Sequence, residues 1–329
     1  MTTDIPLGSR VVLRYRLPPG STHPMTDVIG TLESVEPLVA VRAADDSLVE
    51  VETNRVVALK AVPARPVRAS EIRSLELASA DGWPGIEHAW IDGWLARYGH
   101  GFTGRANSAA PLGDRGSVGS LDDSSPGGTL DRLREWYAER DRPLRLLIPD
   151  RLGEVPLGWN VSDEVVVMAA DVDNLALPEG PRTTTVTDHP DPDWLALYRY
   201  RGSALPDFAV DVLDSVRGGT LGFGRIGAAD STLLAVARGS VTSAPDDRRW
   251  VGLTAVEVAE AHRRHGIGSL ICGDMINWGR EHGATHACLQ VAVENEGAQA
   301  MYRNLGFVAH HRYRYATEPV GRGSVGDCR

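Results

Sequence analysis

The sequence predicts a mixed α/β (α+β) protein in three parts, and three observations lead to this prediction. Short segments between residues 10 and 62 alternate apolar and polar residues and are separated by turn residues, as strands of a small β-barrel are. The middle of the chain mixes helical and strand patterns. The last third has alternating strands, then a long helical apolar stripe and a buried strand, which predict a sheet covered by helices.

Composition places the chain among ordinary globular proteins. It has 329 residues, of which 42% are hydrophobic and 24% charged, enough for more than one core. The net charge of −10 argues against a nucleic acid or an anionic membrane as a partner. We find no signal-peptide pattern and no apolar run of about 18 residues, and therefore expect a cytoplasmic protein. The three cysteines lack paired spacing, so we expect neither a disulfide framework nor a metal site.

The first part, residues 1–63, is predicted to be an SH3-like β-barrel. Its expected strands cover residues 10–17, 28–33, 38–42, 48–51 and 56–59. Turn residues such as Pro18-Pro19-Gly20 separate them. Pro63 and Pro66 mark a linker to the next part.

The second part, residues 68–180, is predicted to be an α/β domain. A helical pattern begins at Ala69 and is broken at Trp83-Pro84-Gly85. An amphipathic helix is expected over residues 130–140. Strands are expected at residues 144–148 and 164–170.

The third part, residues 183–319, is predicted to be a second α/β domain with a mixed sheet. Residues 320–329 are polar and rich in glycine, and we expect a disordered tail there. The expected helices cover residues 193–200, 209–217, 265–282 and 298–304. The expected strands cover residues 220–226, 232–239, 250–258, 288–293 and 307–315.

A turn between a strand and a helix carries the clearest functional signal. The strand ends in Val256-Glu257-Val258, and Arg263-Arg264-His265-Gly266-Ile267-Gly268 leads into the helix. A helix start leaves about four N–H groups unpaired and carries partial positive charge, which suits phosphate. Glycines let the backbone approach an anion closely, and arginines add charge-assisted hydrogen bonds. The turn alone is also compatible with an ordinary strand–helix connection.

A second motif downstream makes the assignment specific. Asn295-x-x-Ala298-x-x-x-Tyr302-x-x-x-Gly306-Phe307 follows the buried strand, in the order and on the elements that the first motif requires. With Arg263-x-x-Gly266-x-Gly268, it resembles the GCN5-related N-acetyltransferase (GNAT) family. The resemblance implies that two central strands of the C-terminal sheet splay into a V, and that acetyl-CoA lies in this V.

The resemblance also implies which residues hold acetyl-CoA. The strand backbone would bond the pantetheine arm, and the loop after it would wrap the pyrophosphate. The expected cofactor-binding residues are Val256, Val258, Arg263, Arg264, His265, Gly266, Ile267, Gly268, Ser269, Asn295, Ala298 and Tyr302.

Tyr302 and Glu257 are the expected catalytic residues. A phenol can protonate the departing thiolate, which favours Tyr302 as general acid. Glu257 is the candidate base, acting directly or through water, but a slip of one residue in strand register would turn it to the other face. By the same resemblance, the Val258 N–H is a candidate oxyanion donor.

The segment 101–108, Gly-Phe-Thr-Gly-Arg-Ala-Asn-Ser, resembles one found in a group of actinobacterial acetyltransferases. Those proteins carry a degenerate GNAT-like half before the active one, and some have an SH3-like barrel in front. By this resemblance, residues 68–180 form the degenerate half. The segment 101–108 is expected either to line the acceptor cleft between the halves or to be a packed structural loop.

Several functions remain open at this level. The leading hypothesis is direct acetyl transfer from acetyl-CoA to a primary amine of a small molecule or a protein, by a monomer or a homodimer. The alternatives are a role like that of mycothiol synthase, which also has tandem halves, and a non-catalytic acetyl-CoA sensor or scaffold. The acceptor cannot be deduced from the residues.

Overall fold

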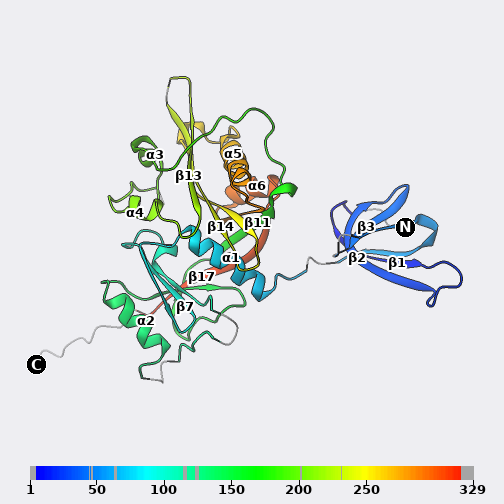
Figure 1. Cartoon of the computed structure of the whole chain (residues 1–329), viewed down its shortest axis with the longest axis horizontal. Coiled ribbons are helices and arrows are strands. Elements are labelled where there is room, and N and C mark those ends of the chain that lie inside the picture. The colour runs from blue at the N-terminus through cyan, green and yellow to red at the C-terminus, as the bar shows by residue number, and fades with distance from the viewer. Residues whose placement is uncertain are drawn as a thin grey trace, which may run out of the picture. The chain divides into compact units, whose positions relative to one another are not determined.

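The computed structural model describes residues 5–43, 45, 47–62, 65–113, 117–122, 126–200, 202–230 and 232–319 (Figure 1). It divides into two compact units, Met1–Pro66 and Val67–Arg329. The expected disordered tail, residues 320–329, lies outside the described residues.

The first unit is a five-stranded antiparallel sheet in the order β4-β3-β2-β1-β5. All five strands predicted from the alternating pattern are present, and their inward positions form one apolar core. The strands are β1 (Arg10–Arg16), β2 (Met25–Ser34), β3 (Leu38–Ala43), β4 (Leu48–Glu52) and β5 (Val56–Ala61).

The second unit is built on one large mixed sheet in the order β12-β13-β14-β15-β16-β11-β17-β9-β8-β7-β6, with β10 paired to β17. In chain order its strands are β6 (Glu87–Ile91), β7 (Trp94–Tyr98), β8 (Ala109–Ala110), β9 (Arg145–Pro149), β10 (Asn160–Val161), β11 (Val165–Asp171), β12 (Thr185–Thr187), β13 (Thr220–Gly227), β14 (Leu233–Ser243), β15 (Arg249–Val258), β16 (His286–Ala292) and β17 (Val308–Thr317).

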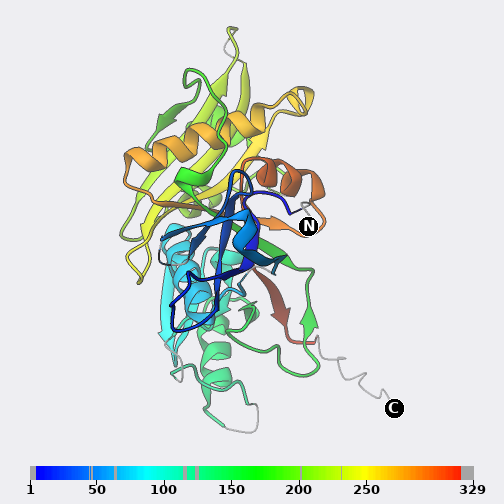
Figure 2. The ribbon, with the colours of Figure 1, turned by 90° about the vertical axis from the view of Figure 1, so that its right-hand side faces the viewer.

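Helices cover both faces of this sheet (Figure 2). They are α1 (Ala69–Gly82), α2 (Thr129–Ala138), α3 (Pro192–Leu197), α4 (Ala209–Leu213), α5 (Ile267–Glu281) and α6 (Glu296–Asn304). On β15, Val251 and Leu253 point into the core shared with α5, whereas Trp250 points into the core shared with α1. Because neighbouring strand residues face opposite sides, α1 and α5 lie on opposite faces of the central strands.

Helices α3 and α4 are shorter than the sequence pattern suggested. The helix expected over 193–200 ends at Leu197, since Tyr198 is already extended. The helix expected over 209–217 ends at Leu213. The carbonyls of Leu213 and Ser215 there accept hydrogen bonds from the Arg238 guanidinium instead of continuing the helix.

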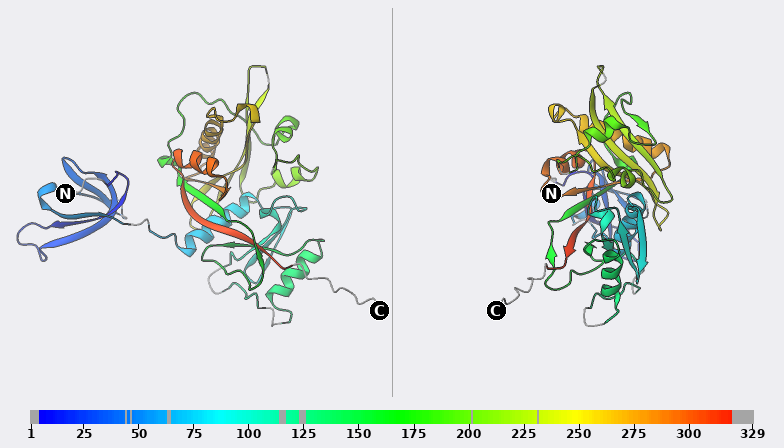
Figure 3. Two further views of the ribbon diagram at one scale, coloured as in Figure 1. Left: turned by 180° about the vertical axis from the view of Figure 1, so that it is seen from behind. Right: turned by 90° about the vertical axis from the view of Figure 1, so that its left-hand side faces the viewer.

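The two expected halves, 68–180 and 183–319, do not have separate sheets. Strand β11 precedes the expected boundary, yet it lies between β16 and β17 and pairs antiparallel with both. The first part of β17 pairs with β11 and its last part with β9, so this strand runs through both halves (Figure 3). Each half therefore completes the sheet of the other.

A buried pair of ionisable side chains joins α1 to β17. Glu76 and His311 are both almost fully buried, and His311 Nε2 lies 2.8 Å from Glu76 Oε1. Nδ1 of His311 lies 2.8 Å from Nδ1 of the neighbouring His310. Burial, and then the charge of His311, lower the pKa of His310 to about 4.

The depressed pKa of His310 predicts a specific loss of stability in acid. Because an unfolded histidine titrates near 6.5, the unfolded chain binds more protons than the folded one between about pH 4 and 6.5. Stability should therefore fall as pH drops through this window, by roughly 1–2 kcal/mol from this residue, since its partial exposure reduces the effect. Urea unfolding of wild type and His310→Gln at pH 7 and pH 4.5 should show a smaller acid loss in the variant; equal losses would refute the assignment.

Candidate functional site

The central strands separate partway along their length. Parallel pairing of β15 with β16 covers Trp250–Leu253 against His286–Leu289 and stops there. Beyond it, β15 carries a bulge in which Ala255 and Val256 lie opposite the single residue Ala237 of β14, and Ala255 has φ of 50°. A bulge bends a strand and redirects its backbone groups. The ends of β15 and β16 thus form the V that the family resemblance implies.

The turn after β15 leads into a helix start without a side-chain cap. Gly266 occupies the N-cap with φ of 79°, a left-handed conformation that glycine adopts without steric cost. The Leu270 N–H makes the first helical bond, to the Gly266 carbonyl. Within the described ranges, the N–H groups of Ile267, Gly268 and Ser269 have no acceptor. These three donors, together with the helix dipole, give this end of α5 the features that suit an anion.

The cationic residues of the turn are exposed, and one of them is tied to the strand. Arg264 and His265 are exposed. Arg263 Nε donates to the Val258 carbonyl at 3.1 Å, and its Nη2 donates to Glu257 Oε1 at 3.0 Å. The Glu257 side chain therefore faces the phosphate-binding turn, held by a guanidinium that is itself 55% exposed.

Helix α6 lies beside the start of α5. Asn295 Oδ1 accepts from the Ala298 N–H at 3.1 Å, so this side chain caps α6. Met301 Sδ would lie 3.0 Å from a Cβ added at Gly268, which shows how closely α6 packs on the turn.

Tyr302 lies inside the core between α5 and α6. Its ring is 7% exposed and packs edge-on against Phe307. Its hydroxyl bonds to the Cys272 thiol on α5, and burial raises the Tyr302 pKa well above 10. The phenol therefore stays protonated, as a proton donor must. Its hydroxyl, however, is enclosed by the core.

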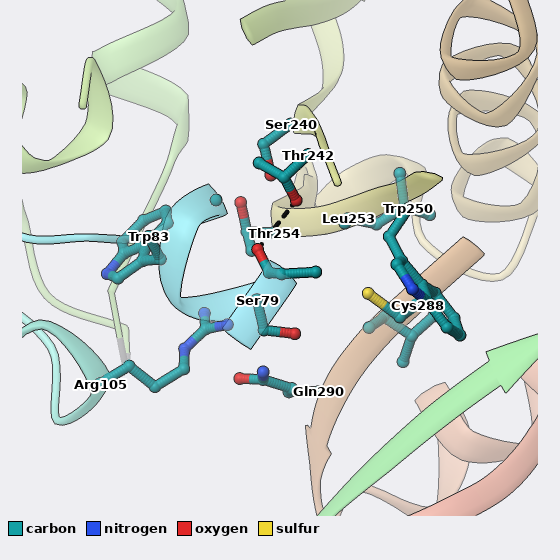
Figure 4. A pocket seen from close by; sticks show the side chains of 14 residues that line it. Ser79, Trp83, Arg105, Ser240, Thr242, Trp250, Leu253, Thr254, Cys288 and Gln290 are labelled. Atoms are coloured by element: carbon teal, nitrogen blue, oxygen red, sulfur yellow. Dashed lines mark hydrogen bonds between the residues drawn. The ribbon is translucent and has the colours of Figure 1, made fainter. Parts of the chain in front are cut away.

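A narrow cavity lies on the other face of the V, under α1 (Figure 4). Its walls are the end of α1 and the residues of β15 and β16 on either side of the point where the strands separate. The polar side chains that line it are Ser79, Arg105, Ser240, Thr242, Thr254 and Gln290. The cavity thus reaches the V from the side opposite α5.

Residues 99–108 form a rigid loop beside this cavity. Asn107 Oδ1 accepts from the N–H groups of Gly99 and Gly101, both at 2.9 Å, and Nδ2 donates to the carbonyls of Phe102 and Thr103 at 2.8 and 2.9 Å. One buried amide therefore fixes the loop. A Cβ at Gly104 would lie 2.7 Å from the Tyr315 ring, so any larger residue there would require this ring to shift.

This loop also lines a wider cleft of about 470 Å³. The other walls come from both halves of the unit: Arg145 and the β10 region on one side, Tyr200 on the other, and Tyr315 of β17. Residues 101–108 were expected to be either a packed loop or the wall of a cleft, and in the structure they are both. Arg105 lines the narrow cavity and its neighbour Gly104 lines the wider cleft.

Sequence reasoning singled out the turn between β15 and α5 but missed the cavity. Trp83 appeared only as a helix end, and Arg238 only as a polar residue in an alternating strand. Both are buried beside the cavity. The signal for Arg238 was its charge within a strand whose two faces are both covered. Over the described residues, no group of three metal-ligating side chains is found. No helix in the described ranges is long and apolar enough to cross a membrane.

The splayed mixed sheet, the bulge and the uncapped helix start define an acetyltransferase of the GNAT fold. A family model described as "Probable histone acetyltransferase Rv0428c C-terminal" matches residues 69–316, and one described as "Rv0428c N-terminal Sm-like domain" matches residues 5–60. The chain belongs to this Rv0428c family. An Sm-like domain is compatible with the SH3-like barrel predicted for the first part.

Individual relatives agree with this placement. "Probable histone acetyltransferase Rv0428c" of Mycobacterium tuberculosis is 40% identical over 312 residues, 94% of each chain. "Uncharacterized N-acetyltransferase YobR" of Bacillus subtilis is 37% identical over 65 residues, 19% of this chain and 26% of that protein. Among solved structures, a GCN5-related N-acetyltransferase from Kribbella flavida superposes with a TM-score of 0.53 at 18% identity, over 77% of this chain and 98% of that chain, which supports the fold.

Proposed function

We propose that the chain transfers the acetyl group of acetyl-CoA directly to a primary amine. The observation that carries the proposal is the V between β15 and β16, which ends beside the three free N–H groups of α5. A pyrophosphate at this helix start would meet the dipole, the backbone donors and the exposed side chains of Arg264 and His265. The pantetheine arm would then run along β15 into the V.

The proposed chemistry uses three groups near the V. The Val258 N–H would stabilise the negative charge that develops on the carbonyl oxygen. Glu257 would accept the amine proton through a water, from its position beside Arg263. Tyr302 would protonate the thiolate, and its raised pKa keeps the phenol protonated before that step.

The acceptor remains the open part of this proposal. The name of the Mycobacterium tuberculosis relative contains "histone acetyltransferase", so a lysine peptide is one acceptor to test. Small amines are the other. Both classes belong in one screen that detects the free thiol of released CoA.

The binding half of the proposal is tested by placing a negative charge at the helix start. Gly268→Glu should weaken acetyl-CoA binding by at least about tenfold, because a carboxylate would compete with the pyrophosphate for the same donors. Isothermal titration with acetyl-CoA measures this. Gly268→Ala is the matched control, since its Cβ meets only the flexible Met301 side chain. Equal affinity of the wild type and Gly268→Glu would contradict the proposed phosphate site.

A non-catalytic acetyl-CoA sensor is a second candidate. The enclosure of the Tyr302 hydroxyl against Cys272 favours it, because a sensor needs no proton donor at the thioester. The variants of Tyr302 discussed below separate the two functions.

A further inference from the structure

The guanidinium of Arg105 lies at the wall of the narrow cavity without an acidic partner. Arg105 belongs to the 3-10 turn Arg105–Asn107, which Asn107 holds in place. Its guanidinium lies 5.1 Å from the centre of the Trp83 ring and extends into the cavity toward Ser79 and Gln290 (Figure 4). Across the described part of the chain, this side chain has no hydrogen bond and no ion pair.

The surroundings of Arg105 contain excess positive charge. Arg238 is fully buried, lies 4.6 Å from the centre of the same Trp83 ring, and donates only to neutral oxygens. Arg97 is also buried. The buried carboxylate of this region, Glu76, is already engaged by His311. Burial, and then the charge of Arg105, lower the pKa of Arg238 to about 9, although the charge of Asp214 acts in the opposite direction.

The other side chains of the cavity offer hydrogen-bonding groups but cannot neutralise this charge. Ser79, Ser240, Thr242, Thr254 and Gln290 offer hydroxyl and amide groups. Among the described residues that line the cavity, none is acidic. An anionic group of the ligand is the missing partner, because a half-buried guanidinium is most stable when a carboxylate or phosphate binds it in the planar two-bond arrangement.

Position along the cavity indicates which end of the ligand bears that anion. Thr254 and Gln290 lie where β15 and β16 separate, at the closed end of the V, and Arg105 lines the same cavity near the end of α1. The wider cleft is lined by Gly104, the neighbour of Arg105 in the chain, and by Tyr315. A short ligand that reaches from the V to Arg105 would therefore place its amine in the V and its anion at Arg105.

We propose that Arg105 binds the carboxylate of the acceptor, which is therefore a small amine with a free carboxylate, an amino acid. This inference rests on the proposed function and names its substrate class. A lysine in a protein chain presents peptide groups instead of a carboxylate behind its amine, so it would leave Arg105 without a counterion. Lysine peptides should accordingly be poor acceptors.

Matched acceptors test the proposal directly. Glycine, β-alanine, 4-aminobutyrate and the common α-amino acids are each compared with their primary carboxamides, and a lysine peptide is included. The readout is kcat/KM for release of CoA thiol. The wild type should prefer the best carboxylate over its amide by tenfold or more, the effect expected from a charge-assisted hydrogen bond. Equal use of acids and amides, or preference for the lysine peptide, would overturn the proposal.

Three variants assign the preference to one side chain. Arg105→Gln should abolish it while acetyl-CoA affinity stays at the wild-type value, and Arg105→Lys should retain part of it. Arg145→Gln is the matched control, because Arg145 lines the wider cleft and its removal deletes the same charge. If Arg145→Gln removes the preference and Arg105→Gln does not, Arg105 is not the carboxylate ligand. Thermal unfolding confirms that each variant is folded.

A binding measurement separates failure of this inference from failure of the proposed function. The N-acetylated form of each amino acid and of its amide is titrated into the protein in the presence of CoA. Binding of the acid alone, lost in Arg105→Gln, supports the carboxylate site even if no amine is acetylated. Acetyl transfer without any such selectivity refutes the carboxylate site and leaves the acetyltransferase function intact. Absence of both transfer and acid binding refutes both.

Discussion

Tyr302→Phe is expected to lower turnover by about 100-fold or more while leaving acetyl-CoA affinity unchanged. Positioned general acids contribute about 10²–10⁴-fold, and the substitution deletes only the hydroxyl. The deletion also removes the bond to the Cys272 thiol. Burial raises the pKa of this thiol to about 12, so it is a poor acid. Single-turnover measurements with saturating acetyl-CoA would report the chemical step itself.

Cys272→Ala is the control for this prediction. It removes the bond between Tyr302 and the thiol but keeps the phenol. If the hydroxyl serves only to pack against Cys272, both variants should lose similar stability and keep wild-type turnover. Retained turnover in Tyr302→Phe would remove Tyr302 from the proposed mechanism. A wild type that binds acetyl-CoA and acetylates no amine would favour the sensor.

The turn between β15 and α5 could be predicted from sequence because its physics is local. Gly266 and Gly268, the preceding arginines and the start of α5 all lie within a few residues, so their spacing alone fixes which groups come together. The strands of the first unit were predictable for the same reason, since each inward residue follows from a period of two.

The exchange of strands between the halves could not be predicted in this way. The segments of β11 and β17 both have strand patterns, but nothing local in either one indicates which strand it pairs with. The placement of β11 between β16 and β17 depends on pairings between residues more than a hundred positions apart, such as Val166 with Val291. A reading that assigns one sheet to each half therefore misses how they join.

The residues on the acceptor side of the site could not be predicted from the sequence, for a related reason. Arg238 follows the alternation expected of a polar, outward-facing strand residue, but α1 covers that face of the sheet. Arg105 lies within a segment that resembles other acetyltransferases. Its guanidinium indicates a binding site only because Trp83, Thr254 and Gln290 line the same cavity, which the sequence does not show. Charge in a strand covered on both faces is the sequence signal worth checking in relatives.

Arg238 is also where the largest loss of stability is expected. Its guanidinium joins three segments: Nε donates to Leu213 O at 2.6 Å, and Nη2 donates to Ser215 O at 2.7 Å and to Gly82 O at 2.9 Å. These bonds tie the ends of α1 and α4 to β14. Deleting the guanidinium leaves three carbonyls without their donor, and each buried unpaired group costs about 1–3 kcal/mol.

Arg238→Met should therefore lower the free energy of unfolding by about 3–5 kcal/mol, because the relief of removing a buried charge offsets only part of the loss. Urea unfolding followed by far-UV circular dichroism measures the change. Arg217→Met is the matched control, since Arg217 pairs with Asp81 at the same end of α1 but is partly exposed, and such pairs contribute about 1 kcal/mol or less. If the two variants lose amounts of unfolding free energy that differ by less than about 1 kcal/mol, the three carbonyls find other donors. Arg238 would then not be the residue that holds the α1 wall of the cavity in place.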